Sequence, residues 1–298
     1  MLAIIIPFYK LKYFEETLKS IAIQTDKRFK VYIGNDASHE NPRELLIKYN
    51  GKFDFEYQKF ESNLGSISLV KQWHRCLTMT KNEAWSMILG DDDVLSENVV
   101  ESFYKNLNNI LNKNINVIRF ASYRINEFGE NISEIYDHPN IEKSSDFLFR
   151  KSRSSLSEYI FNSKVVEEIK FKNFPLAWYS DVLAVLEFSD FGNVFSINEA
   201  FLKIRISNES ISGQKTNIDL KESATFQFYE YLILNRINEF SSSQMKIIFD
   251  KLDTRFINNK KNINIFLRIN MIYLKIINFY GLLNFYKSIA KSVFNKFK

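Results

Sequence analysis

The sequence predicts an α/β fold, in which a mostly parallel sheet is flanked by helices and followed by an all-helical C-terminal appendage. Two observations support this class. Short apolar runs alternate with segments of helical periodicity over the first 120 residues, which is typical of βαβ units, whereas residues 219–298 show only helical periodicity. With 298 residues, of which 45% are hydrophobic, the chain is long enough for one large domain and an appendage. We place these at residues 1–215 and 216–298.

Four apolar runs in the first third of the chain are expected to form strands. The run at 2–6 is continuously apolar and ends at Pro7, which has no N–H for a neighbouring strand. The helix after the fourth run is expected to begin with Ser96 as its N-cap and Glu97 in its first turn. In chain order, we predict strands at 2–6, 29–33, 53–57 and 85–89, and helices at 12–24, 42–49 and 66–78.

The second half of the chain continues this pattern and then becomes helical. We expect a strand at 116–122, a pair of extended segments over 123–136, a helix at 179–188, and a last strand followed by a polar loop over 201–210. The remaining periodicity predicts helices at 220–240, 244–256, 263–280 and 282–297.

Polar segments follow three of the predicted strands at the point where each strand ends. They are residues 7–10, 35–36 and 91–93, and open parallel sheets bind ligands beyond the carboxyl ends of their strands. The last segment is Asp91-Asp92-Asp93, whose negative charges repel one another unless a cation is present. Hard carboxylate oxygens suit Mg²⁺ or Mn²⁺. For an isolated triplet, a solvated acidic turn is the alternative.

Missing motifs argue against several classes of site. No Gly-x-Gly-x-x-Gly follows the first strand and no Gly-x-x-x-x-Gly-Lys-Ser/Thr occurs, which disfavours the usual dinucleotide and P-loop sites. The single cysteine, Cys76, rules out an internal disulfide and a Cys-based zinc site. His39, His74 and His138 show no metal-ligand spacing. The short N-terminal apolar run has no positive region before it, so we expect a first strand rather than a signal peptide, and a cytoplasmic protein.

Five fragments, in this order, resemble the signature of family-2 glycosyltransferases. They are Ile4-Ile-Ile-Pro-Phe-Tyr, Ser20-Ile-Ala-Ile-Gln-Thr25, Asn35-Asp36-Ala-Ser38, Asn63-Leu-Gly65 and Leu89-Gly-Asp-Asp-Asp. The resemblance implies a GT-A-like, Rossmann-type fold, a nucleotide-sugar donor, a divalent metal (Mn²⁺ or Mg²⁺) and inversion at the anomeric carbon. We expect a UDP-sugar as donor. The acceptor is expected to be a hydroxyl of a glycan or lipid-linked oligosaccharide in bacterial capsule, O-antigen or lipooligosaccharide synthesis.

The resemblance also assigns roles to residues on the donor side. The loop at Pro7–Tyr9 and Asp36 would hold the nucleoside base, and the triplet would be the DxD element. Asp91 is expected on the ribose side, and Asp93 or Asp92 on the metal. Because Gly90 stands where the family often has a further Asp, the register of the metal ligand stays open. The full set expected to bind the nucleotide-sugar is Pro7, Phe8, Tyr9, Asp36, Asn63, Gly65, Asp91, Asp92 and Arg205.

A catalytic base is implied as well. Inverting transfer needs a carboxylate that removes the proton of the acceptor hydroxyl. Family members place an acidic residue in a Trp-containing stretch, which matches Asp181 in Phe174-Pro-Leu-Ala-Trp-Tyr-Ser-Asp181, with Asp190 as the fallback. Without the resemblance, Asp181 reads as a helix cap. Arg205 either reaches the diphosphate or forms a structural ion pair, and Ser207 stands where some members have a metal-binding His.

Basic residues are concentrated in the tail. From Thr254 onward there are nine Lys or Arg and no Asp or Glu, whereas residues 1–253 contain 31 basic and 35 acidic residues. Arg268 and Lys275 interrupt the apolar positions, so a spanning helix is not expected. The tail is either an interfacial helix on an anionic membrane, which would place the protein on the inner face of the cell membrane, or a packed bundle with solvated lysines. In the last helix the broad apolar surface is expected to contain Leu283, Phe285, Tyr286, Ile289, Val293, Phe294 and Phe297.

Two other function classes stay open from the sequence. An apolar strand that ends in Asp-x-Asp also resembles haloacid-dehalogenase phosphatases, in which Asp91 would be the nucleophile of a phosphoryl transfer. In those enzymes the motif closes the first strand, whereas here the first strand ends at Pro7. A non-catalytic, membrane-associated binding protein would account for the tail alone. No nucleic-acid-binding motif is present, and the oligomeric state is not predicted.

Overall fold

The structure is a computed structural model that describes residues 1–150, 154–214, 216–258, 260 and 262–294. The chain divides into two compact units, the N-terminal unit (Met1–Asn217) and the C-terminal unit (Ile218–Lys298).

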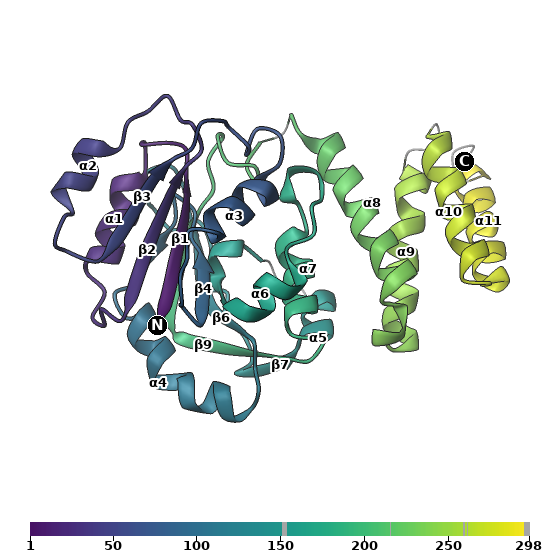
Figure 1. Ribbon diagram of the computed structural model, residues 1–298. Helices are drawn as coiled ribbons and strands as arrows, with labels where there is room; N and C mark the ends of the chain where they lie inside the picture. Colours follow the sequence, from purple (N-terminus) through teal and green to yellow (C-terminus); the bar gives the residue numbers. More distant parts are fainter. Residues whose placement is uncertain (151–153, 215, 259, 261, 295–298) are drawn as a thin grey trace. The chain divides into compact units, whose positions relative to one another are not determined.

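Strands and helices alternate through the first part of the N-terminal unit, as the apolar runs predict (Figure 1). The elements of its first half are β1 (Leu2–Phe8), α1 (Phe14–Ala22), β2 (Phe29–Asn35), α2 (Arg43–Lys48), β3 (Phe55–Lys59), α3 (Leu69–Leu77), β4 (Trp85–Ile88), β5 (Val94–Leu95) and α4 (Val99–Asn112). Those of its second half are β6 (Val117–Ile125), β7 (Ile141–Lys143), α5 (Ser144–Phe149), η1 (Leu156–Glu158), β8 (Tyr159–Asn162), α6 (Ser163–Ile169), η2 (Pro175–Ala177), α7 (Ser180–Phe188) and β9 (Asn193–Arg205).

Within the described residues, nine strands form one sheet in the order β3-β2-β1-β4-β8-β6-β9-β5, with β7 paired to β9. The first four strands are parallel neighbours, and Leu2 of β1 lies opposite Phe29 of β2 and Trp85 of β4. Their carboxyl ends therefore meet at one edge. β8 is antiparallel to both β4 and β6, which makes the second half of the sheet mixed. The predicted α/β class is confirmed.

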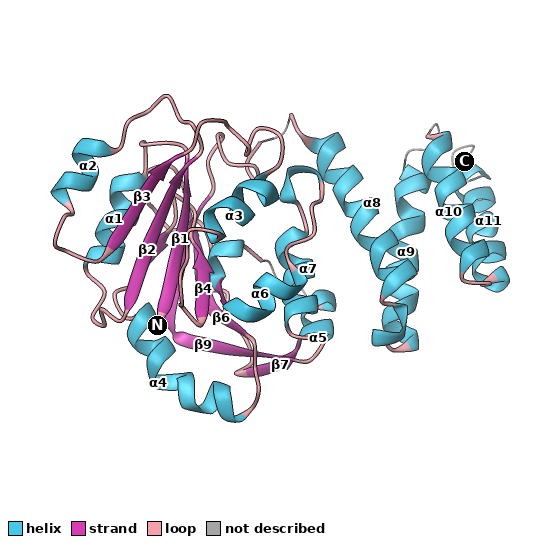
Figure 2. Cartoon of the chain, viewed as in Figure 1, coloured by secondary structure: helices cyan, strands magenta, loops and turns pink. Residues whose placement is uncertain are grey.

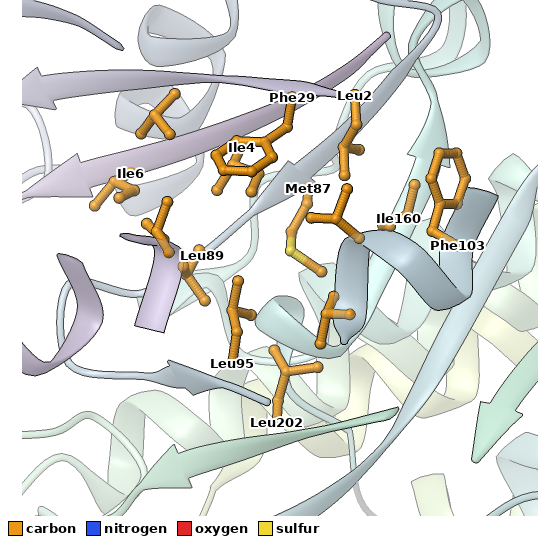
Figure 3. Close-up of a cluster of buried hydrophobic side chains, with 14 of the residues drawn as sticks. Leu2, Ile4, Ile6, Phe29, Met87, Leu89, Leu95, Phe103, Ile160 and Leu202 are labelled. Carbon is orange, nitrogen blue, oxygen red and sulfur yellow. The ribbon is translucent and has the colours of Figure 1, made fainter. Parts of the chain in front are cut away.

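Helices cover both faces of this sheet (Figure 2). Alternate residues of β1 point to opposite sides because side chains alternate along a strand. Leu2, Ile4 and Ile6 belong to a buried cluster that includes side chains of α1 and α4 (Figure 3). Ala3 and Ile5 belong to a second cluster, with side chains of α3, α6 and α7. Burial on both faces explains why this strand is a continuous apolar run in the sequence.

Two details of the N-terminal unit differ from the sequence predictions. The N-cap predicted at Ser96 is wrong, because α4 begins after Asn98. Ser96 Oγ instead accepts from the N–H of Phe201 and donates to Asn98 Oδ1, so it joins β9 to the start of the helix. No element was predicted between residues 137 and 173, where the structure has β7, α5, η1, β8 and α6.

The C-terminal unit is helical, as predicted. Its elements are α8 (Ile218–Asn235), η3 (Ile237–Glu239), α9 (Ser242–Asn258), α10 (Ile263–Lys275) and α11 (Phe279–Phe294). The sequence suggested a helix up to residue 280, but α10 ends at Lys275 because Ile277 adopts a positive φ of 55°. Asn278 then begins α11 by accepting from the N–H of Gly281. Among the described residues, no helix is both long enough and apolar enough to cross a bilayer.

Candidate active site

A cleft of about 630 Å³ opens in the N-terminal unit at the carboxyl ends of β1 and β4. It brings together residues that lie far apart in the sequence. The predicted site residues that line it are Pro7, Tyr9, Asp91, Asp92, Asp93, Asp181 and Arg205. The other predicted residues lie outside its lining, namely Phe8, which is in the core, and Asp36, Asn63 and Gly65.

The triplet turns away from the sheet directly after Gly90. The N–H of Gly90 donates to Ser157 Oγ at 3.0 Å. A Cβ on Gly90 would lie 3.0 Å from a carboxylate oxygen of Asp92 and from one of Asp93, which is tighter than most real contacts. Glycine therefore allows the carboxylates to fold back over the end of the strand.

Asp91 joins the end of β4 to the loop after β1. Its Oδ2 accepts from the backbone N–H groups of Tyr9 at 2.7 Å and Lys10 at 2.9 Å. Removal of solvent in the cleft raises the pKa of Asp91 to about 6, and the negative charge of Asp93 acts in the same direction, against the two N–H donors. The side chain fixes the shape of the Tyr9–Lys10 loop, which forms one wall of the cleft.

Asp93 is buried and held by several donors. Its Oδ1 accepts from the N–H of Arg205 at 2.9 Å, its Oδ2 accepts from Ser157 Oγ, and its carbonyl accepts from Thr17 Oγ1 at 2.8 Å. These bonds tie the triplet to α1, η1 and β9. Asp93 therefore adds negative charge to the cleft and also holds three elements of the site together.

The Asp92 side chain has a different environment. Its carbonyl accepts from Arg205 Nε at 3.0 Å, but among the described residues its carboxylate has no donor other than its own backbone N–H. Desolvation raises the pKa of Asp92 well above its ordinary value, and Asp93 and Asp91 add to this effect while Arg205 opposes it. A carboxylate that is crowded by like charges and largely without donors is well suited to bind a cation.

The guanidinium of Arg205 is held by protein groups on several sides. Besides Asp92, it donates to the carbonyl of Asn126 at 2.9 Å and to Glu16 Oε2 at 2.6 Å, and it lies 4.1 Å from the centre of the Tyr13 ring. The sequence left open whether Arg205 reaches the diphosphate or forms a structural ion pair. Its ion pair with Glu16 and its other protein contacts favour the structural role.

Asp36 lies at the end of β2 and shapes the turn before α3. Its carboxylate accepts from the N–H groups of Leu64 at 2.8 Å and Gly65 at 2.7 Å, and it forms an ion pair with Arg75. A Cβ on Gly65 would lie 2.5 Å from Asp36 Oδ2, so this close approach requires glycine. Asn63 is a turn residue whose Oδ1 accepts from the N–H of Ser66.

Asp181 enters the cleft from the first turn of α7 and accepts from Ser154 Oγ at 3.0 Å. The chain before it is strained, because Leu176, Ala177 and Tyr179 have φ values of 58°, 54° and 70°. Non-glycine residues rarely adopt such values, and strain of this kind is concentrated at functional sites. Asp190, the fallback, lies beyond the opposite end of α7 and does not line the cleft.

Sequence reasoning missed one side of the site. Residues 154–157 line the cleft and supply the hydroxyls of Ser154 and Ser157 to Asp181 and Asp93. The serine-rich composition of this stretch was the available signal. It also missed Glu209, whose carboxylate forms ion pairs with Lys10 at 2.9 Å and Lys12 at 3.1 Å across the mouth of the cleft.

The described residues contain no group of three or more His, Cys, Asp or Glu side chains that could hold a metal ion by themselves. A metal bound together with a diphosphate does not need such a group. Mg²⁺ in phosphate sites is commonly held by one or two carboxylates and by the phosphate oxygens. Asp92, with Asp93 beside it, fits that requirement.

Comparison with known proteins gives a family for this chain. The sequence model described as "Glycosyl transferase family 2" matches residues 3–164. This is more than half of the chain, and it includes β1, the Asp36 turn and the triplet. No curated protein sequence gives a significant match.

Solved structures share the fold at low sequence identity. S. aureus TarS residues 1–349 in complex with UDP-GlcNAc superimposes with a TM-score of 0.63 and 16% identity, covering 88% of this chain and 74% of that one. A longer TarS structure gives a TM-score of 0.60 and 16% identity over 86% of this chain, which spans only 43% of its length. GalNAc-T7 with UDP, GalNAc and Mn²⁺ gives 0.51 and 10% identity, covering 84% and 54%.

Proposed function

The chain belongs to glycosyl transferase family 2, and from this premise we propose that it transfers a sugar from a UDP-sugar to an acceptor hydroxyl, with inversion and with the help of a divalent metal. The observation that carries the proposal is one cleft that joins the Asp91–Asp93 triplet at the end of β4 to Asp181 at the start of α7. A cation-binding group and a candidate base thus lie on the walls of a single pocket.

The donor side of the proposal follows from the contacts of the triplet. Asp92 is the principal metal ligand, assisted by Asp93, because its carboxylate is the least engaged by the protein. Asp91 orients the Tyr9–Lys10 loop toward the nucleotide. A bound Mn²⁺ or Mg²⁺ supplies charge neutralisation for the leaving diphosphate. UDP as the nucleotide is supported by the UDP-GlcNAc bound to TarS, and Mn²⁺ as the metal by the Mn²⁺ bound with UDP to GalNAc-T7.

The acceptor side depends on Asp181. This carboxylate removes the proton of the acceptor hydroxyl as the oxygen forms a bond to the anomeric carbon on the face opposite the diphosphate. The bond from that carbon to UDP breaks, and UDP leaves with the electron pair. Ser154 holds Asp181 in place, and the strained turn at 176–179 fixes the entry of α7.

We keep the contacts to the base and the ribose with the residues that the resemblance assigns, but the residues differ in whether they line the cleft. Pro7 and Tyr9 line the cleft, whereas Asp36, Asn63 and Gly65 support the turn beside it. Arg205 positions the triplet through its backbone N–H and its guanidinium. The haloacid-dehalogenase alternative is set aside, because the family match covers Asp91 and its strand.

We place the acceptor among lipid-linked glycans of bacterial surface polysaccharides, with the enzyme peripheral on the inner face of the membrane. The acid-free basic run that begins at Thr254 supports this location, since cytoplasmic leaflets carry negative charge.

A thermal-shift experiment on the full-length protein tests the donor side. Saturating UDP with Mn²⁺ is expected to raise the melting temperature by about 5 °C, because ligand at about 100 times its dissociation constant stabilises a protein by about 2.7 kcal/mol. ADP with Mn²⁺, and UDP with a chelator, are expected to give much smaller shifts. The absence of a shift with every nucleoside diphosphate would contradict the proposal.

A further inference from the structure

Helix α10 is apolar on two opposite sides. Its inner side is packed into the C-terminal unit through buried Ile269, Ile272 and Tyr273. Its outer side carries large apolar residues at intervals of four, four and three, which places them on one stripe: Ile263, Leu267, Met271 and Leu274, exposed by 68%, 52%, 52% and 52%. A helix that packs on only one side is expected to be polar on the other, so this exposed apolar stripe is suited to contact a further surface.

The stripe continues onto α11 and onto the turn between the two helices. Tyr286 Oη donates to Asn270 Oδ1 at 2.5 Å, which joins the outer sides of the helices. Leu283 is exposed by 59%, three residues before Tyr286. At the turn, Ile277, Phe279 and Tyr280 are exposed by 73%, 59% and 75%. We call these nine apolar residues, from Ile263 to Tyr286, the outer face.

One residue of the apolar surface predicted for the last helix is not on the outer face. Phe285 lies on the part of the predicted apolar surface that packs inside the unit, because it is fully buried against Phe256 and Tyr273. Phe297 lies outside the described residues. The structure thus shows a packed helical hairpin that also has an apolar outer face, where the sequence suggested a choice between a bundle and an amphipathic helix.

Positive charges border the outer face. Lys275 follows Met271 by four residues, and Lys287 and Lys291 follow Leu283 by four and eight, so each lies near the stripe. All three side chains are exposed. Arg268, by contrast, forms an ion pair with Glu230. From Thr254 onward no acidic residue balances these lysines.

We propose that the outer face docks on an anionic phospholipid bilayer, with Ile277, Phe279 and Tyr280 entering the headgroup region and the lysines contacting lipid phosphates. Aromatic residues and lysines at the edge of an apolar surface suit the interface between acyl chains and water. A second copy of the chain is a poorer occupant, because it would bring the same lysines against these ones. The surface is independent of the donor chemistry.

Vesicle co-sedimentation of the full-length protein tests the proposal. Vesicles that contain phosphatidylglycerol are expected to bind the protein, and binding is expected to weaken between about 0.1 M and about 0.5 M salt as the charges are screened. The double variants I277S/F279S and K287E/K291E are each expected to lower the partition coefficient by at least about tenfold. Ile47→Ser on α2, where the side chain is 65% exposed, is the matched control and should bind as the wild type does.

Three results would overturn the proposal. They are unchanged binding of both double variants, equal binding to pure phosphatidylcholine vesicles, and light scattering that shows an oligomer which either double variant dissociates. Circular dichroism and the UDP-dependent thermal shift check that the variants fold. Because the thermal shift is measured separately, failure of vesicle binding leaves the proposed sugar transfer standing.

Discussion

In the N-terminal unit the carboxylates of the candidate site line a cleft, whereas in the C-terminal unit the lysines beside the outer face are exposed on the surface. The N-terminal unit has 27 basic and 29 acidic residues, and the C-terminal unit has thirteen basic and six acidic ones. The two units also differ in how many of their large apolar side chains are exposed. Among the described residues, thirteen that are exposed lie in the 81-residue C-terminal unit and twelve in the much longer N-terminal unit. The difference indicates that one unit is organised around an enclosed site and the other around an open surface.

The largest expected effect is the loss of sugar transfer when Asp181 in the N-terminal unit is changed, with no effect on vesicle binding by the C-terminal unit. Asp181→Asn should lower the rate of sugar transfer by about 10³-fold, because the acceptor hydroxyl loses its base. The UDP-dependent thermal shift and vesicle binding should stay as in the wild type. Asp190→Asn, at the other end of α7, is the matched control and should retain activity. If Asp190→Asn were the inactive variant, the assignment of the base would be wrong.

A smaller effect is expected at the triplet. Asp92→Asn should weaken Mn²⁺-dependent UDP binding by at least about a hundredfold, which titration calorimetry can measure. The control is Asp54→Asn, at an exposed carboxylate beside β3. Loss of metal dependence in Asp93→Asn but not in Asp92→Asn would transfer the role of principal ligand to Asp93.

The C-terminal unit also has a buried carboxyl group, Asp253, which does not belong to the candidate site. Burial raises the pKa of Asp253 from 3.8 to about 7, against a hydrogen bond from Tyr273 at 2.9 Å. The folded unit therefore keeps a proton that the unfolded chain releases. Its contribution to stability is complete below about pH 4 and is lost as the pH rises toward 7.

Asp253→Asn should accordingly flatten the pH dependence of unfolding of the C-terminal unit between about pH 4 and pH 7. In a domain of this size each kcal/mol changes the melting temperature by about 4–8 °C, so calorimetry should resolve the effect. Asp250→Asn, at an exposed neighbour three residues earlier, should leave the pH dependence nearly unchanged. Equal slopes for wild type and Asp253→Asn would show that the carboxyl group does not hold the proton.

The smallest effect concerns the ion pairs at the mouth of the cleft. Glu209→Gln frees Lys10 and Lys12 for the diphosphate and should tighten UDP binding by no more than about fivefold, because exposed ion pairs contribute at most about 1 kcal/mol. The gain should shrink at high salt. Weaker UDP binding in Glu209→Gln would mean that the carboxylate itself supports the nucleotide.

Local patterns predicted much of the fold and part of the site. The apolar runs before Pro7 and before Gly90 predicted the strands β1 and β4. The structure shows that these two strands are parallel neighbours and that their side chains are buried. The segment at 154–162 was not predicted, because its strand β8 depends on antiparallel neighbours that are distant in the sequence. The burial of Phe285 and the exposure of Leu283 were not distinguished from the sequence, because α11 has one broad apolar surface and its periodicity does not show which part packs inside the unit.

The hydrogen bonds of Arg205 join the last strand of the N-terminal unit to a motif that ends at residue 93. All five signature fragments lie within the first 93 residues, so they leave the ribosome early. Asp93 Oδ1 accepts from the backbone N–H of Arg205, and the guanidinium of the same residue donates to the carbonyl of Asp92. A nascent chain that ends before β9 thus carries all five signature fragments without the strand that holds Asp92 and Asp93 in place.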